Sequence, residues 1–183
     1  MRKIILQVAT SLDGYIEDAN GAYDWCSDPE YGTAQDYGMT DFLSRIDTLF
    51  MGRKTFDMMK DMPVNPDDPF VKSMAHIKQY VFTSNENMAS SNEYTVISKN
   101  TIEWMRDYKN TNGKDIWLFG GASFTTSLLE HRLVDELILA VHPILLGGGK
   151  SFNQFQKGRI KLSLIDAEKY NTGLVMMKYS IRD

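Results

Sequence analysis

Apolar residues recur along the chain in short runs, and each run stops at a glycine, a proline or a polar cluster. Runs that are almost uninterrupted are typical of strands covered on both faces of a sheet. This pattern predicts strands over residues 2–9, 48–51, 78–85, 94–98 and 115–121, and a further strand in the segment that starts at residue 134. The tail alternates apolar and polar positions around residues 171–173, which predicts a terminal hairpin.

Segments with helical character separate several of these strands. The sequence predicts helices over residues 40–46, capped by Thr40 and Asp41, after Gly52, and over residues 101–108 and 124–131. Residues 11–25 and 62–70 are punctuated by glycine or proline and predict loops. Strands that alternate with helices, followed by antiparallel strands, predict an α/β fold with a sheet of mixed direction. We expect a single domain over residues 1–183.

Composition narrows the class of protein without naming a function. The chain has 183 residues, of which 43% are hydrophobic and 24% charged, as in an ordinary soluble protein with room for a ligand cleft. A net charge of −4 gives no general attraction to nucleic acid or to an anionic membrane. Cys26 is the single cysteine, so no intramolecular disulfide forms, and a cytoplasmic location is expected. The three histidines show no metal-ligand spacing, so no metal is expected.

Three strand ends carry residues suited to a phosphorylated ligand. Gly52 to Thr55 combines a glycine, two cations and a hydroxyl where a helix begins, Thr83 and Ser84 supply small hydroxyls, and Gly120 and Gly121 open another helix. Backbone N–H groups at helix N-termini attract anions, and ligands of open α/β sheets bind beyond the carboxyl ends of strands. Alone, each segment reads as an exposed turn. Together they favour a dinucleotide site.

The order of the motifs resembles a known superfamily. "SLDGYI", "MGRKTF", "VFTSN", "LFGGASF" and "HPILLGGGKSF" occur in the order of the dihydrofolate reductase-like proteins, especially the branch with the RibD C-terminal reductase domain. The resemblance covers essentially the whole chain. It implies a three-layer α/β/α fold with a mixed, mostly parallel central sheet and a C-terminal antiparallel hairpin.

The resemblance also implies NADPH as cofactor, held across the strand ends. Ala9 would lie beside the nicotinamide carboxamide and Ile16 near the nicotinamide face. The remaining contacts would come from three groups: Gly52, Arg53, Lys54 and Thr55 at the pyrophosphate and adenosine; Thr83 and Ser84 at the adenine ribose and its 2′-phosphate; and Gly120, Gly121, Ala122, Ser123 and Phe124 at the pyrophosphate. The Gly120–Gly121 peptide bond would be cis.

Four residues are substrate-site candidates by the same resemblance: Asp13, Trp25, Glu30 and Gly147. Asp28, beside Glu30, is an alternative for the substrate-binding acid of the dihydrofolate reductases. The other three candidates also have a plain structural reading. Asp13 sits in a turn, Trp25 covers the edge of a core, and Gly147 belongs to a flexible glycine turn. The resemblance implies that this turn lies beside the active cleft, with Lys150 as a candidate anion contact.

Two functions of different class follow. The first is an NADPH-dependent reductase of a small pterin- or pyrimidine-like compound, resembling 5-amino-6-(5-phosphoribosylamino)uracil reductase. The second is a non-catalytic NADPH-binding module that acts as a sensor or scaffold. The sequence shows no unmistakable general acid, so the catalytic residues stay unassigned. A homodimer is expected, with an apolar surface at residues Leu174, Val175, Met176 and Met177.

Overall fold

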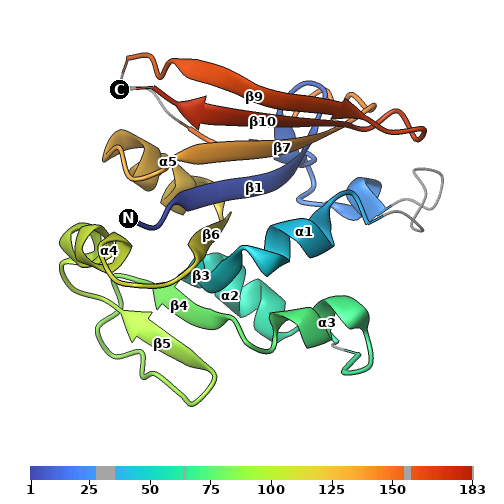
Figure 1. Ribbon diagram of the computed structural model, residues 1–183. Helices are drawn as coiled ribbons and strands as arrows, with labels where there is room; N and C mark the ends of the chain where they lie inside the picture. The colour runs from blue at the N-terminus through green and yellow to red at the C-terminus, as the bar shows by residue number, and fades with distance from the viewer. Residues whose placement is uncertain (28–35, 64, 155–157, 183) are drawn as a thin grey trace.

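A single large sheet forms the centre of the molecule (Figure 1). The computed structural model describes residues 1–27, 36–63, 65–154 and 158–182. The sheet order is β5-β4-β3-β6-β1-β7-β10-β9. The strands are β1 (Ile4–Ser11), β3 (Ile46–Gly52), β4 (Lys78–Phe82), β5 (Tyr94–Ile97), β6 (Asp115–Gly120), β7 (Glu136–His142), β9 (Leu162–Lys169) and β10 (Val175–Ile181).

The direction of the strands confirms the expected mixed sheet. From β5 to β7 every neighbouring pair is parallel, whereas β10 runs antiparallel to both β7 and β9. The carboxyl ends of six strands therefore meet at one edge of the sheet, which we call the carboxyl edge. The C-terminal hairpin is also as predicted, since Tyr170 donates a backbone hydrogen bond to Leu174 across the turn at 2.9 Å.

Helices cover both faces of the sheet and give the three-layer arrangement. On one face, α1 (Met39–Ser44) and α2 (Arg53–Lys60) bury Phe42 and Phe56 in a core with the strands. On the other face, α4 (Thr101–Lys109) and α5 (Ala122–Glu130) bury Met105 and Leu128. Strand side chains alternate between these two cores, as the pleat requires.

Several boundaries differ from the sequence predictions. Helix α1 ends at Ser44, and Ile46 instead begins β3, where its side chain is fully buried. The N-cap of α1 is Gly38 rather than Thr40. Within the predicted loop 62–70, Asp68 caps a short helix, α3 (Pro69–Met74), by accepting a hydrogen bond from the Phe70 backbone at 2.8 Å. An aspartate followed by a proline at the first helical position is a signal for the start of a helix. The sequence prediction missed it because the three prolines of this segment favoured a loop.

A second, two-stranded sheet lies in segments predicted as loops. Strands β2 (Tyr15–Glu17) and β8 (Lys150–Ser151) pair antiparallel, and a 3₁₀ helix follows at Asp24–Ser27. Neither strand is long enough to show alternation in the sequence. Their pairing depends on a contact between segments far apart in the chain, which local patterns do not contain.

Two buried cations lie at the opposite edge of the sheet, where the parallel strands begin. Arg2 forms an ion pair with Asp47 and is 5% exposed. Lys109 is 6% exposed and donates to the Asp135 carboxylate at 2.7 Å and to the Leu133 carbonyl at 3.1 Å. Buried charges are tolerated only when they are paired in this way.

Candidate cofactor and substrate site

Sheet order brings the three predicted strand ends side by side. Gly52, the last residue of β3, pairs with Phe82 of β4, and Met51 pairs with Gly120 of β6. Thr83 and the adjacent Ser84, which follow β4, therefore lie at the carboxyl edge next to the glycines. The structure thus brings together the residues that the sequence proposed as one site, although they are far apart in the chain.

Two helix N-termini meet at this edge. Helices α2 and α5 have Gly52 and Gly121 as their N-caps, and no side chain caps either helix. A Cβ added at Gly52 would lie 3.2 Å from Phe124 Cβ, and one added at Gly121 would lie 2.9 Å from Thr55 Oγ1. The two glycines therefore let the helix starts approach closely. Uncapped N–H groups and two converging helix dipoles favour an anion between them.

The double-glycine segment has the predicted backbone geometry. The Gly120–Gly121 peptide bond is cis, and Gly120 has a φ of +114°. Helix α5 starts at Ala122, with Ser123 exposed in its first turn. The Phe124 ring stacks on Phe82 with ring centroids 4.9 Å apart, which fixes the start of α5 against the end of β4.

The cations of the α2 segment differ in their surroundings. Arg53 Nε donates to both carboxylate oxygens of Asp57, one helical turn later, at 2.6 Å, and Arg53 Nη1 lies 3.1 Å from Met88 Sδ. Lys54 is exposed. Of the hydroxyls after β4, Thr83 accepts a hydrogen bond from the Asn85 backbone at 3.0 Å. Arg53 is thus a positioned cation at the carboxyl edge.

Asp13 and Gly147, two predicted substrate residues, are in direct contact. The Asp13 carboxylate accepts hydrogen bonds from Ser11 Oγ at 2.6 Å, the Gly147 backbone at 2.8 Å and the Leu146 backbone at 3.2 Å. These bonds, that from Ser11 above all, lower the pKa of Asp13. Asp13 therefore works as an ionised acceptor that ties the turn after β1 to the glycine turn after β7.

The small sheet supports this connection. Ile16 lies in the middle of β2, and Glu17 in the same strand forms an ion pair with Lys150 of β8 at 2.5 Å. Lys150 thus links the two strands of the small sheet through this ion pair. A Cβ on Gly149 would overlap the Glu17 carbonyl oxygen, so glycine is required for β2 and β8 to approach.

Trp25 and His142 form a buried pair that the sequence did not connect. Their rings meet edge to face with centroids 5.3 Å apart, and they are 8% and 5% exposed. His142 is the last residue of β7 and pairs with Ser11 of β1, which places it at the carboxyl edge. Within the described residues, the Trp25 indole nitrogen has no hydrogen-bond partner. The fourth predicted substrate residue, Glu30, lies outside the described residues.

The stability of the protein is expected to depend on His142 below neutral pH. Burial lowers the pKa of His142, so the folded protein holds the imidazole neutral while the unfolded chain protonates it below about pH 6.5. This contribution is therefore intact above that pH and is lost as the pH falls toward the lower pKa of the folded state. Between about pH 7 and 5, the melting temperature of the unchanged protein should fall more steeply than that of His142→Gln. Equal slopes would contradict this assignment.

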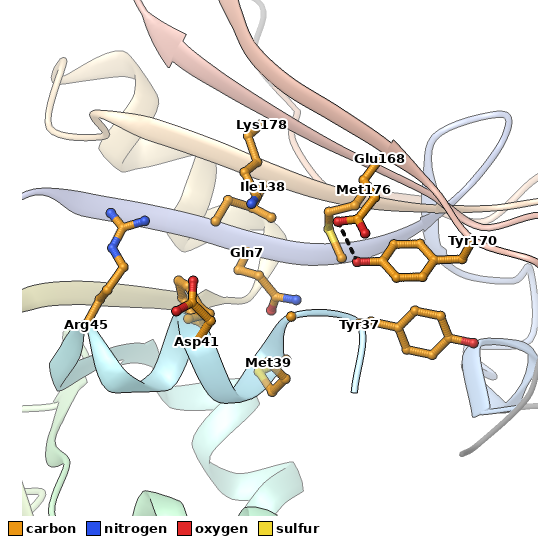
Figure 2. Close-up of a pocket in the computed structure, with 12 residues that line it drawn as sticks. Gln7, Tyr37, Met39, Asp41, Arg45, Ile138, Glu168, Tyr170, Met176 and Lys178 are labelled. Carbon is orange, nitrogen blue, oxygen red and sulfur yellow. Dashed lines mark hydrogen bonds between the residues drawn. The ribbon is translucent and has the colours of Figure 1, made fainter. Parts of the chain in front are cut away.

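A pocket lies on the α1 face of the sheet (Figure 2). Its walls include Gln7 of β1, Ile138 of β7, Met176 of β10 and two tyrosines, Tyr37 and Tyr170. The tyrosine rings meet edge to face with centroids 4.9 Å apart. Burial and a hydrogen bond to the Glu168 carboxylate raise the pKa of Tyr170 to about 12, so its hydroxyl stays protonated. The pocket is thus lined by apolar and uncharged polar groups together with four charged side chains, those of Asp41, Arg45, Glu168 and Lys178.

Comparison with known proteins places the chain in a family. The family model of the RibD C-terminal domain matches residues 2–176. The chain belongs to the RibD C-terminal domain family. YyaP of Bacillus subtilis strain 168, itself an uncharacterised protein, is 40% identical over 184 residues, which cover 97% of this chain and 94% of YyaP.

Solved structures agree with this membership of the RibD C-terminal domain family. A candidate riboflavin biosynthesis protein from Shewanella sp. PV-4 superposes with a TM-score of 0.83 at 26% identity, over 99% of both chains. Dihydrofolate reductase from Enterococcus faecalis, complexed with NADP(H), gives a TM-score of 0.62 at 18% identity over 99% of this chain and 97% of that one. The predicted superfamily and branch are confirmed, and the family and fold are those of reductases.

The described residues of this RibD C-terminal domain protein lack two kinds of feature. No group of three histidine, cysteine, aspartate or glutamate side chains is arranged there to hold a metal ion. Nor does that part of the chain contain a helix long and apolar enough to cross a membrane.

Proposed function

We propose that this protein is an NADPH-dependent reductase of a small pterin- or pyrimidine-like heterocycle. One observation carries the proposal: the uncapped N-termini of α2 and α5 converge at the carboxyl edge, separated only by Gly52 and Gly121. A side chain at either glycine would intrude on this space. The site therefore fits a ligand whose anionic centre must approach bare backbone, as a dinucleotide pyrophosphate does.

The surrounding residues fit the rest of the cofactor. Arg53 and Lys54 supply positive charge on one side of the glycines, with Thr83 and Ser84 beside them for the adenine ribose and its 2′-phosphate. Ala9 and Ile16 lie toward the other end, on β1 and β2, where the nicotinamide would sit. NADPH supplies the hydride, and the protein supplies orientation and exclusion of water. In this proposal Asp13, Trp25 and Gly147 are the residues next to that end that would contact the substrate.

Nucleotide binding and turnover are tested separately. Titration with NADPH, followed by its fluorescence, should show saturable binding to the unchanged protein. Oxidation of NADPH in the presence of a panel of pterins, pyrimidines and ring-opened ribityl derivatives should identify a substrate. Binding without oxidation by any compound would favour the alternative, a nucleotide-binding sensor or scaffold. Failure to bind NADPH would overturn both.

The preference for NADPH over NADH is expected to depend on Arg53. A charge-assisted contact with the 2′-phosphate is worth about 1.5–3 kcal/mol, or roughly tenfold to a hundredfold in affinity. Asp57 holds the Arg53 side chain at the carboxyl edge, so the guanidinium does not have to be ordered on binding. Arg53→Gln should therefore weaken NADPH binding by about that factor and change NADH binding little. Lys54→Gln is the matched comparison, and equal affinity of the unchanged protein for both nucleotides would contradict the assignment.

We also propose a symmetric homodimer, but its apolar surface differs from the one that the sequence predicts. Leu174 and Met176 are 2% and 5% exposed because they face the core of the protomer. The exposed large apolar side chains of the hairpin are instead Leu162, Leu164 and Ile165 on the edge strand β9, which are 38%, 59% and 54% exposed. An edge strand of this kind is a natural pairing surface. Light scattering at micromolar protein should give twice the protomer mass, and Leu164→Lys should give the monomer. A monomeric unchanged protein would rule out the dimer.

A further inference from the structure

The chain from β1 to α1 is strongly acidic. Residues 4–44 contain no lysine, arginine or histidine, but they contain eight carboxylates: Asp13, Glu17, Asp18, Asp24, Asp28, Glu30, Asp36 and Asp41. Strand β1 ends at the carboxyl edge, and α1 leads back to the start of β3 at the opposite edge (Figure 1). The turn after β1 therefore places acidic residues at the end of the carboxyl edge where the nicotinamide and the substrate would lie.

The two ends of the carboxyl edge carry opposite charge. Arg53 and Lys54 follow β3, whereas Asp13 follows β1 and accepts a hydrogen bond from Gly147 in the turn after β7. In the sheet, β6 and β1 lie between β3 and β7, so the two ends are three strand spacings or about 14 Å apart. The pyrophosphate of a dinucleotide belongs at the cationic end. A further phosphate at the acidic end would meet charge of its own sign.

The neighbouring segments do not reverse the charge of the acidic end. The Asp13 carboxylate is ionised at neutral pH, because its hydrogen bonds lower its pKa. Residues 143–149, which form the turn after β7, contain no charged side chain. Lys150 in β8 follows that turn, but Glu17 lies 2.5 Å from its ammonium and Asp18 lines the same open groove. These two carboxylates outweigh the single charge of Lys150.

A buried donor without a partner lies in the same acidic segment. Trp25 directly follows Asp24 and is 8% exposed, and its indole N–H has no hydrogen-bond partner within the described residues. Buried donors are normally satisfied, so an acceptor from outside the protein, on a ligand or a water, is expected there. An indole N–H only donates, which fits a ring carbonyl or a ring nitrogen. The acidic end is thus suited to a heterocycle.

We propose that the substrate of this protein carries no phosphate, and that the acidic end of the carboxyl edge takes a heterocycle with an uncharged or cationic substituent. A phosphate monoester has a charge of about −1.5 to −2 at neutral pH, so Asp13, Asp18 and Asp24 would repel it, whereas an ammonium group would be attracted. Phosphoribosylamino compounds are then excluded as substrates. The inference rests on the proposed function, because it takes the substrate to lie next to the nicotinamide.

Three pterins that differ only in the 6-substituent test this charge selectivity. At pH 7, 6-hydroxymethylpterin has an uncharged substituent, its phosphate ester an anionic one and 6-aminomethylpterin a cationic one. Calorimetry measures their binding with and without NADP⁺, which cannot donate a hydride. A pyrimidine pair, 5-amino-6-ribitylaminouracil and its 5′-phosphate, repeats the comparison. At low salt the phosphate esters should bind about tenfold or more weakly than the alcohols, and the amine at least as tightly as the alcohol.

Salt and charge variants separate repulsion from a difference in shape. The Debye length falls from about 30 Å at 0.01 M salt to about 3 Å at 1 M, so the discrimination should shrink as salt rises. Asp18→Asn combined with Asp24→Asn should reduce it by about threefold or more at low salt, because two charges are removed. An asparagine at position 18 keeps an oxygen for the backbone N–H groups of Asn20 and Ala22, which Asp18 binds.

A control with the same change in net charge comes from the other face of the sheet. Glu103 and Asp107 are exposed on α4, and Glu103→Gln combined with Asp107→Asn should leave the discrimination unchanged. Melting curves should show all variants folded. The inference is overturned if no ring compound binds, if the phosphate esters bind as tightly as the alcohols, or if the discrimination ignores both salt and the Asp18 and Asp24 charges.

NADPH binding, measured separately by its fluorescence, distinguishes this inference from the proposed function. Any of these contrary results together with saturable NADPH binding would reject the charge selectivity alone. Charge-selective binding of the ring compounds without NADPH binding would reject the proposed reductase instead.

Discussion

Gly121→Val is expected to abolish NADPH binding and to leave a folded protein. The new Cβ would lie 2.9 Å from Thr55 Oγ1, and the two γ-carbons of valine would extend into the space between the starts of α2 and α5. A pyrophosphate needs that space for its contacts with backbone N–H groups. Affinity should fall by about a hundredfold or more, because losing several charge-assisted hydrogen bonds costs more than about 3 kcal/mol. Fluorescence titration with NADPH measures the loss.

Stability of the same variant separates this role from that of a simple turn. Gly121 has φ −80° and ψ −170°, an extended conformation that valine also adopts, so the cost is limited to the crowding at Thr55. Overpacking of this kind costs about 1–3 kcal/mol, and the melt should stay cooperative. Gly148→Ala is the matched control, because a Cβ there meets nothing within 4 Å, and it should change neither property. A Gly121→Val protein that melts early but binds NADPH normally would identify the segment as a turn only.

The sequence was sufficient to predict that the three strand ends share one edge of the sheet, because each of them carries glycines or small hydroxyl residues. Parallel strands put their carboxyl ends at one edge, so glycines and hydroxyls at three strand ends had to meet once the sheet was right. The position of β1 in the sheet could not be predicted in this way. Its place between β6 and β7, which sets Ala9 beside Ala140, depends on sheet order rather than on any local pattern.

Residues missed by the sequence prediction fall into two kinds. The pairing of Arg53 with Asp57 was visible as a spacing of four residues on a predicted helix. The contact of His142 with Trp25 was not visible, because it joins the end of β7 to a 3₁₀ helix more than a hundred residues earlier. The burial of Leu174 and Met176 likewise depends on which face of the hairpin meets the core.

Asp135→Asn is expected to be the most destabilising single change at the opposite edge of the sheet. The Asp135 carboxylate accepts a hydrogen bond from Lys109 Nζ at 2.7 Å and another from the Ile4 backbone N–H at 2.7 Å. Removing the carboxylate charge leaves Lys109 buried without its counter-ion, which costs about 3–5 kcal/mol for a fully buried pair. Because the Asp135 side chain is 29% exposed, we expect the lower end of that range, about 3 kcal/mol, in urea unfolding. NADPH affinity should not change.

Lys109→Met and the double variant decide where this cost arises. Lys109→Met removes the buried charge itself and leaves a carboxylate that is partly hydrated, so it should cost less than Asp135→Asn. Combining the two should recover most of the stability lost in Asp135→Asn, because no uncompensated charge is then buried. The coupling between the positions should be about 1–3 kcal/mol. A double variant with the summed loss of both single changes would show that the cost lies in hydrogen bonds to the backbone, such as that from Ile4, and not in the buried ammonium.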